Sequence, residues 1–131
     1  ILGKTIDALL KVSEKAVSEI NKIKNVILPF PGGIVRSGSK VGSKYKNLIA
    51  STNFEYCPTL RGVVDSKLDS ASNYVLEIVI DGLTESDIIL AMRAGIDSVI
   101  KSDCKNINSI SAGNYGGKLG PYLFWLKKIM S

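Results

Sequence analysis

Residues 74–101, with the sequence YVLEIVIDGLTESDIILAMRAGIDSVIK, decide the fold because they predict a strand followed directly by a helix. β-Branched and aliphatic residues fill Tyr74–Ile80, and the Asp81-Gly82 pair that follows is a typical stop signal for a strand. A threonine and an aspartate then resemble a helix capping box, with Asp in place of the usual Glu. Apolar residues recur every three or four positions after that box, which predicts a helix over Glu85–Lys101.

The same periodicity places a second helix and several short strands elsewhere in the chain. Thr5–Lys22 has apolar residues at helical spacing with charged residues between them, so it predicts an amphipathic helix. Val26–Leu28 predicts a short buried strand that ends at the prolines and glycines of Pro29–Gly33. Ile107–Ala112 and Tyr122–Lys127 are further strand candidates, and they flank a glycine-rich loop.

The order of these elements points to one α+β domain over residues 1–131, because a chain of this length accommodates one core of ordinary size. Strand, helix, strand, strand, helix, strand is the split βαβ order of ferredoxin-like domains. Such a domain has an antiparallel sheet with two helices on one face. Its opening strand would have to precede Thr5, so we expect that strand to be largely missing.

The composition excludes most metal sites and histidine-dependent active sites. The chain has no histidine and only two cysteines, Cys57 and Cys104. Ordinary zinc sites, imidazole general bases and Ser-His-Asp triads are therefore excluded, and we expect no bound metal. Acid–base chemistry would have to use carboxylates, lysines, tyrosines or thiols.

The sequence also predicts the compartment. It has no basic leader and no apolar run near the ~18 residues that a membrane span needs, so we expect no membrane association. Reduced thiols fit a cytoplasmic location. The chain begins at Ile1 without an initiator Met, and we expect it to be cut from a longer protein.

Positive charge and glycine are concentrated in the same two stretches. The net charge is +5, and neither Ile20–Phe54 nor Cys104–Ser131 contains an acidic residue. Both stretches are rich in glycine, as expected where a backbone closely approaches an anion, although flexible basic loops would give the same pattern. The aromatic strand motif of RNA-binding sheets is missing, so we expect no nucleic-acid partner.

Glu77 is the residue that most clearly suggests chemistry. Side chains alternate along a strand, which places Glu77 between Val75 and Val79 on one face. A carboxylate among valines is poorly solvated, and this favours its protonated form and suits it to general acid or base catalysis. The alternative is a partly wet face on which Glu77 pairs with a lysine.

Four blocks of the sequence carry a family resemblance. They are PFPGGIVRSGSKVGSK (29–44), ASTNFEYCPT (50–59), EIVIDGLTESDIILAMRAGI (77–96) and ISAGNYGGKLG (110–120). The chain resembles the formylmethanofuran:tetrahydromethanopterin formyltransferases of methanogenic archaea and their relatives, and specifically their C-terminal, distal lobe. The resemblance implies a subunit built from two ferredoxin-like lobes, with the N-terminal lobe absent from this chain.

The resemblance also implies an activity in methanogenesis and one-carbon metabolism. These enzymes move a formyl group from formylmethanofuran to N5 of tetrahydromethanopterin. Both coenzymes act as substrates with anionic tails, no cofactor is tightly bound, and the subunits form homo-oligomers. By position, the acid–base carboxylate of the family falls on Glu77.

The glycine loops and basic stretches would then line the substrate cleft. The substrate-binding candidates on them are Pro31, Gly32, Gly33, Ser39, Lys40, Lys44, Asn114, Gly116, Gly117 and Lys118. We expect this chain alone to be inactive if the cleft needs both lobes. Two alternatives stay open: a non-catalytic pterin-binding or assembly module, and a subunit of a bacterial formyltransferase/hydrolase complex.

Overall fold

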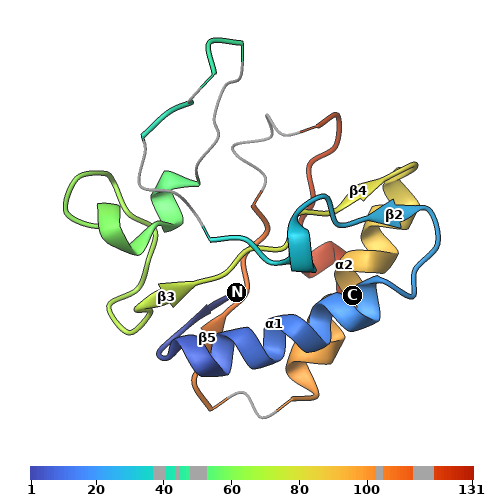
Figure 1. The fold of residues 1–131 in the computed structure, drawn as a ribbon, viewed down its shortest axis with the longest axis horizontal. Helices are drawn as coiled ribbons and strands as arrows, with labels where there is room; N and C mark the ends of the chain where they lie inside the picture. The colour runs from blue at the N-terminus through green and yellow to red at the C-terminus, as the bar shows by residue number, and fades with distance from the viewer. Residues whose placement is uncertain (37–40, 44, 48–52, 103–104, 114–119) are drawn as a thin grey trace.

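The computed structural model describes residues 1–36, 41–43, 45–47, 53–102, 105–113 and 120–131 (Figure 1). Its helices and strands, in chain order, are β1 (Leu2–Gly3), α1 (Ile6–Ile20), β2 (Val26–Ile27), β3 (Tyr74–Val75), β4 (Asp81–Gly82), α2 (Glu85–Ile100), β5 (Ile107–Ser109) and α3 (Leu126–Ile129). Short 3₁₀ turns η1 (Pro31–Gly33), η2 (Phe54–Tyr56) and η3 (Pro58–Leu60) lie between β2 and β3. The predicted α+β class is confirmed.

The extended segment 74–82 joins two antiparallel sheets. At its start, β3 pairs with β1, and β1 pairs on its other edge with β5. At its end, β4 pairs with β2. Taking 74–82 as one broken strand, the order β5-β1-β3/β4-β2 is that of the split βαβ fold, with antiparallel neighbours throughout. The ferredoxin-like prediction is therefore confirmed.

The opening strand is present, but it is short. Only Leu2–Gly3 is assigned to β1, and this strand lies at the centre of the three-stranded sheet. Ile1 extends the pairing by one residue, because its amine donates to the Leu76 carbonyl at 2.9 Å and its carbonyl accepts from the Leu76 N–H at 3.1 Å.

The predicted stop signal at Asp81-Gly82 is wrong, because these two residues form β4 and pair with β2. The close approach of α2 explains why a residue without a side chain stands at position 82. A Cβ at Gly82 would lie 2.6 Å from Cγ1 of Ile88, so a larger residue would clash with the first turns of the helix.

Both predicted helices are confirmed with slightly shorter bounds. At the start of α2, the Thr84 hydroxyl accepts from the Asp87 N–H at 3.2 Å, and the Asp87 carboxylate accepts from the Thr84 N–H at 3.2 Å. This is the reciprocal capping box that the sequence indicated. Thr5 precedes α1 without a side-chain capping bond.

The strand predicted over Tyr122–Lys127 is wrong, since Leu126–Ile129 forms the short helix α3. The helical turn forms because of contacts with a distant part of the chain. The Ile129 side chain is buried, and the Ile129 carbonyl accepts a hydrogen bond from Arg93 of α2. These contacts fix a helical turn that the alternating sequence pattern does not reveal.

The core lies between the two long helices and the sheet. Val12 and Ala16 of α1 pack with Val99 of α2, and the partly buried side chains that cover this cluster are Ile1, Ile78, Ile107 and Ile110. The helices approach closely at Gly95, where a Cβ would lie 2.8 Å from Cδ1 of Ile20. Figure 1 shows the ribbons of α1 and α2 crossing.

The turn η1, which follows β2, contains two adjacent glycines, one with open space around it and one packed against other side chains. In η1, Gly32 and Gly33 have φ angles of 72° and 74°, in the left-handed region that disfavours other residues. A Cβ at Gly32 would meet nothing within 4 Å, whereas one at Gly33 would lie 2.9 Å from the nearer methyl of Val17 and 2.8 Å from Cδ1 of Leu28. Gly33 is therefore needed for packing on α1 as well as for backbone shape.

This contrast predicts different costs for the same substitution at adjacent positions. Gly32→Ala should lower the free energy of unfolding by about 1 kcal/mol, through backbone strain alone. Gly33→Ala should lower it by about 3 kcal/mol, since overpacking against α1 adds to the strain. Urea unfolding of both variants measures the difference, and equal losses would show that η1 does not pack on α1 as described.

Candidate functional site

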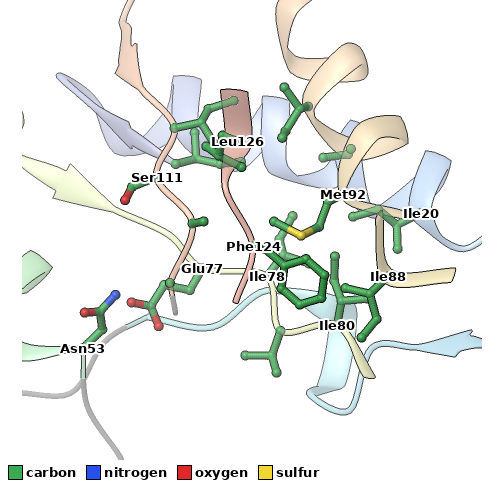
Figure 2. A pocket seen from close by; sticks show the side chains of 18 of the residues that line it. Ile20, Asn53, Glu77, Ile78, Ile80, Ile88, Met92, Ser111, Phe124 and Leu126 are labelled. Carbon is green, nitrogen blue, oxygen red and sulfur yellow. The ribbon is translucent and has the colours of Figure 1, made fainter. Parts of the chain in front are cut away.

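A pocket of about 430 Å³ lies between the second half of segment 74–82, the two long helices and the C-terminal segment. One end of this pocket is apolar and the other is polar. At the apolar end, Figure 2 shows the Phe124 ring among Ile78, Ile80 and Met92. A cavity of this size falls within the range of small-molecule sites, and its lining has the expected mixture of apolar walls and a few polar groups.

Glu77 stands at the polar end, half-buried. Its backbone pairs with Val35, by an N–H···O bond of 2.8 Å in one direction and of 2.9 Å in the other. Leu76, the residue before it, bonds to Ile1 on the opposite edge. Because both edges of the backbone are paired, the Glu77 side chain projects from the face of the segment that borders the pocket.

Three polar residues that sequence reasoning missed surround this end of the pocket. Asn53, just before η2, has its amide facing the Glu77 carboxylate in Figure 2. Ser111, after β5, donates from its hydroxyl to the Tyr56 hydroxyl at 3.1 Å. Asn53, Tyr56 and Ser111 belong to blocks that carried the family resemblance, and this membership was the one available signal for them.

The structure therefore brings together residues from distant parts of the chain. Block 50–59 supplies Asn53 and Tyr56, block 77–96 supplies Glu77, and block 110–120 supplies Ser111. A carboxylate, a carboxamide and two linked hydroxyls form a proton-accepting and hydrogen-bonding group beside an apolar cavity. Such a group can orient an amine or a carbonyl and can exchange a proton with it.

The predicted substrate-binding residues fall into two groups, those that the structure describes and those that it does not. Pro31, Gly32 and Gly33 form η1, which leads through Val35 to the Glu77 pairing, but they do not line the pocket. The other seven candidates lie outside the described residues, and they are Ser39, Lys40, Lys44, Asn114, Gly116, Gly117 and Lys118. Their assignment to substrate binding stays a prediction.

Within the described ranges, no three side chains of Asp, Glu, Cys or His gather in a way that would hold a metal ion. No helix in that part of the chain combines the length and the apolar character required to cross a membrane.

Comparison with known proteins assigns this architecture to one family. The sequence pattern of a family described as "FTR, proximal lobe" matches residues 1–129. The chain belongs to this family. In formyltransferases, the lobe represented here is thus the proximal one, which corrects the distal assignment drawn from the resemblance.

The similar proteins are formyltransferases from bacteria as well as archaea, so the archaeal resemblance was too narrow. The formylmethanofuran–tetrahydromethanopterin formyltransferase of Methylobacillus flagellatus is 58% identical over 132 residues, which cover 100% of this chain and 44% of that protein. This formyltransferase lobe therefore spans less than half the length of that relative.

Two solved structures have the same fold. The formyltransferase/hydrolase complex from Methylorubrum extorquens, solved with methylofuran, matches with a TM-score of 0.83 and 44% identity over 99% of this chain and 42% of that one. The formyltransferase from Methanosarcina barkeri matches with a TM-score of 0.81 and 44% identity over 98% of this chain and 43% of that one.

In the 131-residue polypeptide, the Glu77 carboxylate acts electrostatically on the Ile1 amine. Desolvation in the sheet lowers the pKa of this amine from 8.0 to about 6, and the Glu77 carboxylate opposes part of that change. The amine is consequently neutral in the folded chain over a pH range in which it is charged in the unfolded chain.

This difference predicts a pH-dependent stability for the 131-residue polypeptide. Between pH 8 and pH 6 the unfolded chain binds more protons than the folded chain, so stability falls as the pH falls. The loss from this group should be on the order of 2 kcal/mol, complete below pH 6 and absent above pH 8. Urea unfolding across this range measures it.

N-terminal acetylation provides the matched control. An acetylated Ile1 still carries an N–H that can donate to Leu76, but it has no charge to lose. The acetylated chain should therefore lack this part of the pH dependence. Identical slopes for the two forms between pH 6 and pH 8 would contradict the assignment.

Proposed function

We propose that this chain is the proximal lobe of an enzyme that moves a formyl group from formylmethanofuran to N5 of tetrahydromethanopterin. The observation that carries the proposal is the position of the Glu77 carboxylate, at the polar end of a pocket where three family blocks meet. The proposed reaction is that of a similar protein, the formylmethanofuran–tetrahydromethanopterin formyltransferase of Methylobacillus flagellatus.

The reaction transfers an acyl group between two amines. N5 of the acceptor attacks the formyl carbon, and a tetrahedral intermediate forms with a negative oxygen and a positive nitrogen. Glu77 takes the proton from N5 as its carboxylate and returns it to the methanofuran nitrogen, whose bond to the formyl carbon then breaks. One C–N bond forms and one breaks, the proton moves between the two nitrogens, and no oxidant or reductant is needed.

The polar neighbours of Glu77 would position the reacting groups. The Asn53 carboxamide faces the carboxylate, and it can donate to an oxygen or accept from an amine. The Ser111–Tyr56 hydroxyl pair is held at 3.1 Å and can donate to the developing oxyanion. Placing such donors before the reaction is the main way in which an enzyme without a metal lowers this barrier.

The remainder of the enzyme would complete the site. We propose that an N-terminal lobe, outside these 131 residues, forms the other wall of the cleft, and that whole subunits associate into homo-oligomers. The acid-free stretches Ile20–Phe54 and Cys104–Ser131 would attract the anionic tails of both coenzymes. A cytoplasmic location fits this chemistry, which needs reduced coenzymes.

Replacement of the proton carrier tests the proposal. In the full-length enzyme, Glu77→Gln keeps the size and hydrogen-bonding shape of the side chain but cannot accept a proton. Turnover of formylmethanofuran with tetrahydromethanopterin should fall by about 10² to 10⁴, the usual contribution of a general acid–base residue. Initial-rate kinetics with both coenzymes measure the change.

Glu14→Gln is the matched control, since Glu14 lies exposed on α1 and does not line the pocket. This variant should keep the rate of the unaltered enzyme. A rate for Glu77→Gln within a factor of about three of that control would exclude Glu77 as the proton carrier.

A second candidate assembly is favoured by one comparison. The matching chain of Methylorubrum extorquens belongs to a formyltransferase/hydrolase complex, and its fold agrees with this chain at a TM-score of 0.83. A protein of that kind would copurify with other subunits, whereas a homo-oligomer would not. The native mass of the full-length protein from its own cells distinguishes the two assemblies.

A further inference from the structure

The C-terminal residues 120–131 form a segment that crosses one side of the pocket, and we call this segment the strap. The strap begins at Gly120, whose φ of 72° requires glycine, and continues with Pro121, whose ring fixes the next backbone angle. Both residues line the pocket. The entry of the strap is thus set by local backbone geometry.

The middle of the strap supplies the apolar wall of the pocket. Figure 2 shows the Phe124 ring beside Ile78 of the extended segment and Met92 of α2, and Leu126 also lines the pocket. The Phe124 ring also packs at a tilt against Tyr122, with ring centroids 6.4 Å apart. Movement of the strap would therefore open the apolar end to water.

The far end of the strap is held by one side chain of α2. Arg93 donates from Nε to the Ile129 carbonyl at 2.8 Å, and it donates to the same oxygen from Nη2. Ile129 belongs to the last turn of α3, where carbonyl groups lack helical partners. The two bonds from a charged donor satisfy that carbonyl and clamp α3 to α2.

The Ile129 carbonyl is the hydrogen-bond acceptor that the structure gives for the Arg93 guanidinium. Among the residues that the structure describes, Arg93 forms no ion pair with a carboxylate. It follows Met92, whose side chain lines the pocket, so adjacent positions of α2 shape the cavity and hold its opposite wall. The buried Ile129 side chain adds apolar packing at the same turn.

We infer that Arg93 is a positioning residue for the pocket, acting through the strap rather than on the substrate. By clamping Ile129, it keeps Leu126 on the pocket wall and Phe124 against the apolar end of the cavity, and it sets the width of that end. The effect on catalysis rests on the proposed function, whereas the clamp itself does not.

Substitutions of Arg93 in the full-length enzyme test both parts. Arg93→Met keeps the length of the side chain and removes the donors, while Arg93→Lys keeps the charge and one possible bond. In Arg93→Met, hydrogen exchange of the amides in 120–131 should be about tenfold faster, because the loss of a charged hydrogen bond favours local opening. The KM of the substrate held at the apolar end should rise about tenfold with kcat nearly unchanged.

Arg93→Lys should restore part of both effects, since a lysine at this position can still donate to the Ile129 carbonyl. Arg61→Met is the matched control. Arg61 donates from Nη2 to the Ser72 carbonyl, so it is also an arginine that holds a single carbonyl, but neither residue lines the pocket. Arg61→Met should leave the exchange of 120–131 and both KM values unchanged.

The outcomes separate the clamp from the proposed function. Unchanged exchange of 120–131 in Arg93→Met would overturn the clamp. Faster exchange with KM values equal to those of Arg61→Met would show that the strap does not shape the substrate site. Failure of the proposed function would appear instead in Glu77→Gln, as an unchanged rate, and would leave the exchange result for the strap intact.

Discussion

The extended segment 74–82 is the constraint on which the rest of the lobe depends, because its backbone must bond on both edges. Near its start it pairs with β1, in the middle with Val35, and at its end with β2. Adjacent residues Leu76 and Glu77 bond to opposite edges, as the alternation of an extended chain requires. This double pairing joins the two sheets into one split βαβ order and fixes the face of the segment from which the Glu77 side chain projects.

Placement of the catalytic candidate on such a segment has a physical benefit. The proton transfer that we propose for Glu77 needs a carboxylate in a fixed position, and a paired strand holds a residue more firmly than a loop does. Asn53 and Tyr56 lie at the η2 turn and Ser111 lies just after β5, and contacts hold these segments as well. Tyr56 of η2 is bonded to Ser111, and Glu55 in the same turn forms an ion pair with Lys67 at 2.6 Å.

The sequence predicts the helices well and the strands less well, and the reason is the range of the interactions involved. The helices are visible because their spacing and capping are local, as the Thr84–Asp87 box shows. Gly82 resembles a stop signal, but its lack of a side chain is required by Ile88 of α2. Likewise, α3 depends on Arg93, which is far away in the chain, so Tyr122–Lys127 looks like a strand to any local analysis.

The candidate site was predictable only in part, for the same reason. Glu77 stands out because a charged residue interrupts a run of aliphatic residues, which is a local signal. Asn53 has no such contrast with its neighbours, and only the folded chain shows that it faces the carboxylate. Glycines attract attention in a search for anion sites, yet Gly33 has a sufficient structural explanation in its contacts with Val17 and Leu28.

The short strand β1 has a consequence for the order of folding. The pairing of Ile1 with Leu76 closes a loop of 75 residues, and pairing with β5 closes a still longer one. Such closures cost entropy before any contact compensates for them, so they form late, after helices that need only local contacts. During synthesis β1 leaves the ribosome before either of its partners exists. The central strand is therefore made before the other strands of its sheet and is among the last to be paired.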